Sequence, residues 1–205
     1  MTAEPTPAAQ PVSDWNIANI ITMARIALVP FFVWALLAAG WPVGNLTSLP
    51  LRWTAVAIFA VAALTDKVDG YLARSRNLVT DLGKLLDPIA DKALVGVALV
   101  LLWIPMRELP WWVPVVVLVR EFGITFMRMG LKKYEVMPAS RGGKLKTVLQ
   151  TVAIGLFCFP LANMPHFITV IAWGIMSAAI AVTLVTGIDY AHKGWMIRQA
   201  ARADK

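Results

Sequence analysis

Four aspartates stand out in a chain that is otherwise strongly apolar. Asp66 and Asp69 are three residues apart, so on a helix they share a face. Asp87 and Asp91 are four residues apart and share a face in the same way. Carboxylates crowded together repel one another, so they must bind divalent cations, pair with bases or share protons as a relay. An all-oxygen site suits Mg²⁺ or Mn²⁺, and paired carboxylates can hold two such ions for phosphoryl chemistry.

The elements that must position these aspartates are membrane-spanning helices. The chain is 59% hydrophobic, and several of its runs approach the roughly 20 apolar residues that cross a bilayer. Short links with Pro and Gly separate six apolar segments, at about 19–40, 52–74, 84–104, 111–131, 145–162 and 166–190. We therefore predict an all-α integral membrane protein, a single bundle of six transmembrane helices over residues 15–192. A disordered tail, 1–14, precedes the bundle, and a basic cytoplasmic tail, 193–205, follows it.

The distribution of charge gives the expected orientation. The formal net charge is +7, but the hydrophobicity argues against nucleic acid as a partner. Basic residues gather in the links after the second and fourth segments and after the last one. Cytoplasmic loops carry such an excess, so we expect a multi-pass protein of the cell membrane with both termini in the cytoplasm. These loops would also face anionic membrane lipids. Tryptophans cluster at the other face, as interfacial anchors do.

Helix geometry brings the four aspartates to a similar depth. With the cytoplasmic boundary near Ala73 and Leu82, a rise of 1.5 Å per residue puts them roughly 6–13 Å inside the membrane. The second and third segments run in opposite directions, so their hairpin can bring the carboxylates together near the cytoplasmic face. Small residues beside them, Gly70, Ala73 and Gly83, leave space for a ligand or equally permit close helix packing.

The full spacing of this region matches a known pattern. Written out, it is Asp66-x-x-Asp69-Gly70-x-x-Ala73-Arg74, then eight residues, then Gly83-x-x-x-Asp87-x-x-x-Asp91. It resembles the signature of the CDP-alcohol phosphotransferases. The resemblance implies six transmembrane helices per protomer, usually a homodimer, with a polar cavity open to the cytoplasm. It also implies a reaction in which an alcohol hydroxyl attacks the β-phosphorus of a CDP-linked lipid and CMP leaves.

The same resemblance assigns the metal ligands and the base. It implies that Asp66, Asp69 and Asp87 hold one Mg²⁺ or Mn²⁺ ion. A second ion would lie between Asp66, Asp87 and Asp91. Asp91 would also be the general base that takes the proton of the hydroxyl. Burial and neighbouring carboxylates raise the pKa of such a group and metal ions lower it, and the sequence leaves that balance open.

Further residues are implied for the CDP-lipid. The resemblance puts Gly70, Arg74 and Thr80 in contact with the CDP moiety, with Ala73 and Gly83 leaving space for it. A second pattern, Asn19-x-x-Thr22-x-x-Arg25, resembles the first helix of the family. The predicted CDP-lipid site therefore comprises Asn19, Thr22, Arg25, Gly70, Ala73, Arg74, Thr80 and Gly83.

The acceptor alcohol must be inferred from other segments. The stretches Arg120-Glu121-Phe-Gly-Ile-Thr-x-x-Arg128 and Gly143-Lys144-Leu-Lys146-Thr147 resemble a branch of the family whose acceptor is sn-glycerol 3-phosphate. An unpaired arginine at the depth of Arg120 is costly, so it should face the cavity, and Glu121 should pair with a base elsewhere. The predicted acceptor-phosphate ligands are Arg120, Arg128, Lys144 and Lys146.

Three other interpretations of these features stay open. Inositol 1-phosphate is also a phosphorylated alcohol, and the same bases could serve it. A basic loop against anionic lipid is the plainer interpretation of the two lysines. A metal or ion transporter would also bury acidic residues at membrane depth, but it needs a path across the bilayer. Here the deep charges crowd toward one side, which favours an enzyme with a one-sided cavity. The family resemblance implies CDP-diacylglycerol as its lipid substrate.

Overall fold

The computed structural model describes residues 15–40, 47–75, 80–131 and 141–203, and these form an all-helical bundle without strands. The helices are α1 (Ile17–Ala38), α2 (Leu49–Ser75), α3 (Asp81–Trp103), α4 (Trp112–Leu131), α5 (Arg141–Phe157) and α6 (His166–Ala203), with a short 3₁₀ turn, η1 (Leu161–Asn163). The predicted all-α membrane fold is confirmed, and the described residues form six α-helices. Apolar stretches long enough to cross a bilayer lie in α1, α2 and α6, within Asn19–Ala38, Leu49–Asp66 and His166–Gln199. That all six helices span the membrane stays a prediction.

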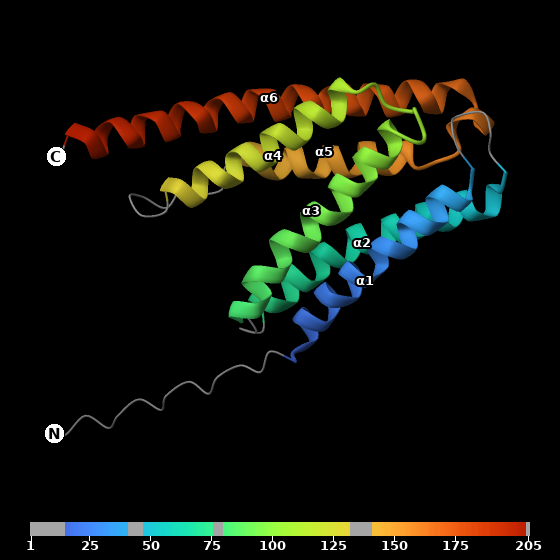
Figure 1. Cartoon of the computed structure of the whole chain (residues 1–205), viewed down its shortest axis with the longest axis horizontal. Coiled ribbons are helices and arrows are strands. Elements are labelled where there is room, and N and C mark those ends of the chain that lie inside the picture. Colours follow the sequence, from blue (N-terminus) through green and yellow to red (C-terminus); the bar gives the residue numbers. More distant parts are fainter. Residues whose placement is uncertain (1–14, 41–46, 76–79, 132–140, 204–205) are drawn as a thin grey trace.

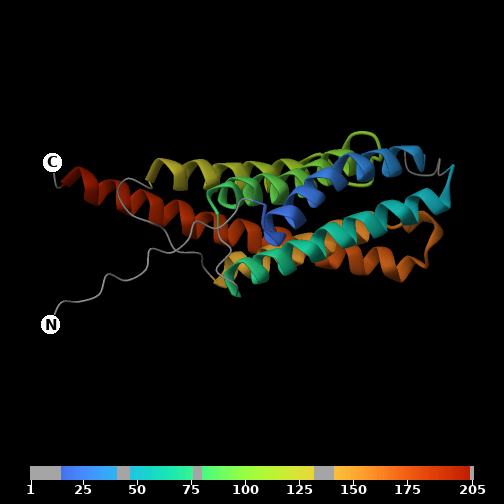
Figure 2. The same ribbon diagram turned by 90° about the horizontal axis from the view of Figure 1, so that it is seen from below.

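Successive helices run in alternate directions (Figure 1). The motif end, as we name it, is the end at which α1, α3 and α5 begin and α2, α4 and α6 end. The other end of the bundle is the opposite end. In the first half α1 packs against α2 and α3, and in the second half α6 packs against α4 and α5. The halves meet where α3 contacts α4 and α5 and where α2 contacts α5, and Figure 2 shows the same bundle from below.

The interior is apolar, and so is much of the surface. Phe32, Phe59, Leu99 and Phe157 are buried in one continuous core that draws on both halves. Large apolar side chains on the outside of several helices, such as Val185, are exposed in the isolated chain. A water-soluble protein rarely exposes so many, so these surfaces suit the hydrocarbon of a bilayer.

The opposite end is fastened by a buried arginine. Arg52 is 2% exposed, and its Nη2 atom lies 2.5 Å from Oε1 of Glu108 in the α3–α4 link. Its Nε atom donates to the carbonyl of Cys158 at 2.7 Å, and Nη2 donates to the carbonyls of Phe157 and Phe159 at 3.0 and 3.2 Å. The Phe157 carbonyl ends α5, and those of Cys158 and Phe159 follow it, so Arg52 binds backbone acceptors where the helix stops. Burial raises the pKa of Glu108 to about 7, although Arg52 opposes the rise.

Two helix ends differ from the expected segments. α5 ends at Phe157 rather than near 162, because Pro160 has no N–H to donate and η1 begins just beyond it. α6 has 38 residues and runs to Ala203, so most of the predicted basic tail continues the helix. The predicted tail 1–14 lies outside the described residues.

Candidate functional site

One threonine hydroxyl ties the start of α3 to α1. Thr80 is the N-cap of α3, and its Oγ1 accepts from the backbone N–H of Gly83 at 3.0 Å. The same oxygen accepts from Nδ2 of Asn19 at 2.7 Å. Asn16 caps α1 in turn, since its Oδ1 accepts from the N–H of Asn19 at 3.0 Å. The two capping residues therefore fix where α1 and α3 begin.

Gly83 is required by this contact between α1 and α3. A Cβ atom at this position would lie 2.6 Å from Oδ1 of Asn19 and 3.3 Å from Oγ1 of Thr80. In the described structure the space beside Gly83 is filled by α1. Close helix packing therefore explains this glycine, and its predicted role of leaving space for the CDP moiety stays a prediction.

The first carboxylate of the motif is paired with a buried arginine. Nη1 of Arg25, on α1, lies 2.5 Å from Oδ1 of Asp66, on α2. Arg25 is 1% exposed and Asp66 is 42% exposed, so the carboxylate is the part that a ligand can reach. Thr22, one turn earlier on α1, is also buried. Two residues of the predicted first-helix pattern thus lie in the interface that carries the aspartates.

The other motif residues are placed by their backbones alone. Asp69, Gly70, Ala73 and Arg74 lie in the last turns of α2, and Asp87 and Asp91 lie in the first turns of α3. Their side chains lie outside what the structure describes. Among the side chains that it does describe, no three potential metal-binding groups gather, and just one of the four aspartates is in that set. The reachable carboxylate of Asp66 is an oxygen ligand of the kind that Mg²⁺ and Mn²⁺ prefer, and the two-ion site stays a prediction.

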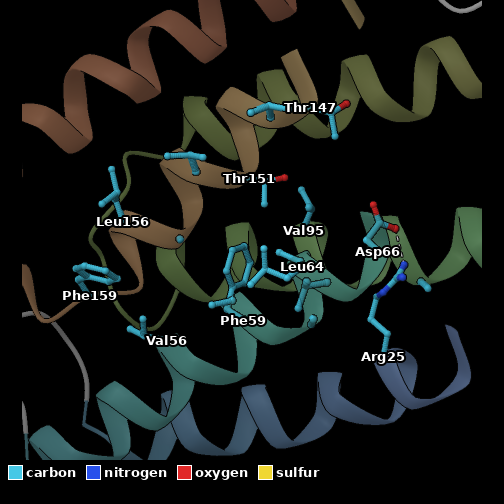
Figure 3. A pocket seen from close by; sticks show the side chains of 18 residues that line it. Arg25, Val56, Phe59, Leu64, Asp66, Val95, Thr147, Thr151, Leu156 and Phe159 are labelled. Carbon is cyan, nitrogen blue, oxygen red and sulfur yellow. Dashed lines mark hydrogen bonds and ion pairs between the residues drawn. The ribbon is translucent and has the colours of Figure 1, made fainter. Parts of the chain in front are cut away.

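A cavity of about 350 Å³ extends from Arg25 and Asp66 between α2, α3 and α5 (Figure 3). Its lining is mostly apolar, including Phe59, Leu94 and Val152. The polar groups lie toward the motif end, where Asp66 and Arg25 face Thr147 and Thr151 of α5. The polar cavity expected from the sequence is therefore not seen along this described wall, which is an apolar slot with a polar mouth.

Three of the predicted acceptor ligands converge where α4, α5 and α6 meet. Lys146 is 4% exposed, and its Nζ pairs with Oε1 of Glu121. Nη1 of Arg120 lies 3.1 Å from the same Oε1 atom, and its Nη2 donates to Oγ1 of Thr186 at 2.9 Å. The expectation that Glu121 pairs with a base elsewhere is confirmed by Lys146. The carboxylate of Glu121 thus pairs with both Lys146 and Arg120.

Arg128 and Lys144 have different surroundings. The guanidinium of Arg128 lies 4.8 Å from the ring centroid of Tyr190, and that of Arg120 lies 5.8 Å from the same ring. Within the described part of the chain, the Nε atoms of both arginines are buried without a hydrogen-bond partner. Lys144 is exposed. The structure therefore brings Arg120, Arg128 and Lys146 together and leaves Lys144 at the surface.

A second, smaller cavity of about 30 Å³ lies beside the cavity that contains Asp66. Glu121, Lys146 and Lys92 line it from α4, α5 and α3. It shares Val95, Thr147 and Thr151 with the larger cavity, and Figure 3 labels these three side chains. Asp66 and Lys146 thus line neighbouring cavities, whereas Arg120 and Arg128 line neither of the two.

Sequence reasoning did not find the contribution of α6. The sequence does not predict Thr186 and Tyr190 as site residues, because an isolated threonine and tyrosine in an apolar run match no functional motif. Their spacing of four residues, which puts them on one face of a helix, was the available signal.

The chain is similar in sequence to known proteins over most of its length. Residues 15–185 match the family model described as CDP-alcohol phosphatidyltransferase. The chain is 47% identical over 175 residues to a "Probable phosphatidylglycerophosphate synthase" of Mycobacterium tuberculosis, covering 85% of this chain and 79% of the relative. It is 41% identical over 189 residues to a "CDP-diacylglycerol--glycerol-3-phosphate 3-phosphatidyltransferase" of Bacillus subtilis, covering 88% and 96%. A protein of the same name from Escherichia coli is 38% identical over 150 residues, covering 69% and 75%.

Proposed function

The chain belongs to the CDP-alcohol phosphatidyltransferase family, and from this premise we propose that it transfers the phosphatidyl group of CDP-diacylglycerol to sn-glycerol 3-phosphate. The products are phosphatidylglycerophosphate and CMP, so the reaction serves phospholipid synthesis. The names of the bacterial relatives support this acceptor. The observation that carries the proposal is the basic cluster of α4 and α5, Arg120, Arg128 and Lys146. Its Lys146 lines a small cavity that shares Val95, Thr147 and Thr151 with the cavity lined by Asp66.

The residues of the chain divide the work between the two substrates. Asp66, Asp69, Asp87 and Asp91 would hold two Mg²⁺ or Mn²⁺ ions. When bound, these ions neutralise the pyrophosphate and stabilise the departing CMP. The carboxylate of Asp91 takes the proton of the acceptor hydroxyl. The hydroxyl oxygen then bonds to the β-phosphorus as the bond from that phosphorus to the oxygen of CMP breaks.

The CDP-lipid site is proposed around the start of α3. Asn19, Thr22 and Arg25 reach it from α1, and Thr80 and Gly83 begin α3 beside it. Gly70, Ala73 and Arg74 complete the predicted set from α2. The apolar slot between α2, α3 and α5 offers space for an acyl chain, since its lining avoids polar side chains away from the mouth.

The acceptor phosphate is proposed to bind at the bases of α4 and α5. Arg120 and Arg128 offer planar guanidinium groups that suit phosphate, and Lys146 adds a buried positive charge. Lys144 is exposed and contributes from the rim. Inositol 1-phosphate is the alternative acceptor, because its phosphate would meet the same bases.

The protein is a membrane protein, and its orientation is part of the proposal. The basic residues flanking the motif end favour a cytoplasmic active site with both termini in the cytoplasm, in a multi-pass protein of the cell membrane. The family resemblance implies a homodimer.

A panel of acceptors tests the function. Purified protein receives Mg²⁺ or Mn²⁺, CDP-diacylglycerol and one of glycerol 3-phosphate, inositol 1-phosphate, serine or glycerol, and CMP release is measured. We expect release with glycerol 3-phosphate. Release with inositol 1-phosphate alone would contradict the acceptor assignment. Metal flux into vesicles without CDP-lipid would favour the transporter interpretation instead.

A further inference from the structure

The α6 face formed by Thr186, Gly187 and Tyr190, which we name the α6 cradle, holds the side chain of Arg120 along its length. Oγ1 of Thr186 accepts from Nη2 of Arg120 at 2.9 Å. A Cβ atom added at Gly187 would lie 3.2 Å from Cγ and 3.9 Å from Nε of Arg120. The ring of Tyr190 lies 5.8 Å from the guanidinium carbon. Three residues on one face of α6 therefore hold both the aliphatic part and the guanidinium group of Arg120.

The cradle also holds the second arginine of the cluster. Arg128 lies two turns beyond Arg120 on α4, and its guanidinium carbon is 4.8 Å from the centroid of the same Tyr190 ring. The negative face of an aromatic ring attracts a guanidinium group without using its N–H donors. In the described part of the chain no carboxylate pairs with Arg128.

The charge of the cluster matches a phosphate monoester. Arg120, Arg128 and Lys146 carry three positive charges, and Glu121 cancels one of them. The remaining two charges suit a phosphate monoester, which carries about −1.5 to −2 at pH 7.

We propose that the α6 cradle is a positioning site that orients Arg120 and Arg128 toward the phosphate of the acceptor. Thr186, Gly187 and Tyr190 act through the two arginines and thereby select a phosphorylated alcohol over its unphosphorylated counterpart. The inference rests on the proposed function, because it takes the acceptor phosphate to bind at these arginines.

The sharpest test is Gly187→Ala. The new methyl group forces the aliphatic part of the Arg120 side chain to move by a few tenths of an ångström. The helix itself should not be destabilised, because alanine has a higher helix propensity than glycine. We expect the KM for glycerol 3-phosphate to rise several-fold, with an unchanged KM for CDP-diacylglycerol and no loss of thermal stability. Gly123→Ala is the matched control on α4, because a Cβ atom there meets nothing within 4 Å. An unchanged acceptor KM in Gly187→Ala overturns the proposal.

A second pair of variants separates the ring of Tyr190 from its hydroxyl. In Tyr190→Leu the acceptor KM should rise about tenfold, as expected for losing aromatic contacts to two partly buried guanidinium groups. Tyr190→Phe keeps the ring and should keep the wild-type acceptor KM, even if the Leu variant folds poorly. An acceptor KM in Tyr190→Phe as high as in Tyr190→Leu overturns the role of the ring.

The same assays distinguish this inference from the proposed function. The ratio of CMP release with glycerol 3-phosphate to release with glycerol should fall in Gly187→Ala and Tyr190→Leu. If the wild-type protein releases no CMP with glycerol 3-phosphate, the proposed function itself is wrong. If the wild type is active and the variants keep its ratio, the positioning role alone is wrong.

Discussion

Nη1 of Arg25 lies 2.5 Å from Oδ1 of Asp66, so α1 contributes a buried positive charge to the first carboxylate of the motif on α2. The pair is asymmetric, because Arg25 is 1% exposed and Asp66 is 42% exposed. The arginine is therefore held by the fold, and the carboxylate keeps a face that a cation or substrate can reach. Arg25 thus compensates acidic charge at the motif without closing the site.

The Arg25→Gln variant should depend on divalent cations for its stability. Breaking a buried pair costs about 3–5 kcal/mol, and the partial exposure of Asp66 makes the cost smaller here. Added Mg²⁺ or Mn²⁺ should take over part of the lost compensation. We expect a lower Tm in detergent than for the wild type, and a larger rise in Tm when the cation is added. Equal cation-induced shifts in both proteins would contradict this role of Arg25.

Gly83→Ala should disturb the contact between α1 and α3. The added Cβ atom would lie 2.6 Å from Oδ1 of Asn19, closer than real Cβ atoms approach, so the two helices must separate or Asn19 must turn away from Thr80. We expect a lower Tm and weaker binding of CDP-diacylglycerol. Gly96→Ala is the control on the same helix, because its nearest contact would be an ordinary 3.7 Å to Leu118. Equal Tm values for the two variants would show that the contact at Asn19 yields easily.

Lys146→Met and Lys144→Met should separate the two lysines of α5. Lys146 is 4% exposed and pairs with Glu121, whereas Lys144 is exposed. Without Lys146 the charge of Glu121 draws more strongly on Arg120, which weakens the hold on the acceptor phosphate. We expect the KM for glycerol 3-phosphate to rise at least tenfold in Lys146→Met, about the 1.4 kcal/mol typical of a charged hydrogen bond, and less than threefold in Lys144→Met. The reverse order would move the acceptor phosphate to the surface of the loop.

Asp91→Asn should abolish turnover and leave CDP-lipid binding largely in place. The amide cannot take the proton of the acceptor hydroxyl, while its size preserves the shape of the site. CMP release and binding of CDP-diacylglycerol to the purified variant provide the two measurements. Asp189→Asn is the matched control, because Asp189 is exposed on α6 and pairs with Lys193. Normal turnover in Asp91→Asn would refute its assignment as the base.

Glu108 should make the stability of the opposite end fall as the pH rises. Its pKa is about 7 in the folded protein and 4.5 for the free side chain. Between these values the unfolded chain has lost the proton that the folded chain keeps, so folding stability decreases from about pH 4.5 to pH 7 and then levels off. The pKa shift lowers the free energy of unfolding by on the order of 3 kcal/mol between the two pH values. Compared with Glu108→Gln, the wild type should lose Tm between pH 5 and pH 8, and parallel curves would contradict the shifted pKa.

The sequence predicted the helices well because the thickness of a bilayer sets the length of each apolar run. The pairing of Glu121 with a base followed from the cost of an isolated charge in such a run. The contacts of Asn19 with Thr80 and of Arg120 with Gly187 did not follow, because they depend on how each helix is rotated about its axis. Packing against neighbouring helices sets that rotation, and one sequence does not reveal it. The same reason hid the difference between Lys144 and Lys146.

The arrangement of Arg52 and Asp66 on one helix gives α2 the mechanics of a lever. Arg52, near the start of α2, donates to the carbonyls of Phe157 and Cys158 at the end of α5. The two helices diverge from there toward the motif end, on either side of the cavity (Figure 1). About 14 residues, roughly 21 Å of helix, separate this pivot from Asp66. A small tilt at Arg52 is therefore magnified where the carboxylate meets its ligands. A change at Arg52 would therefore bear on the position of Asp66 from the opposite end of the bundle.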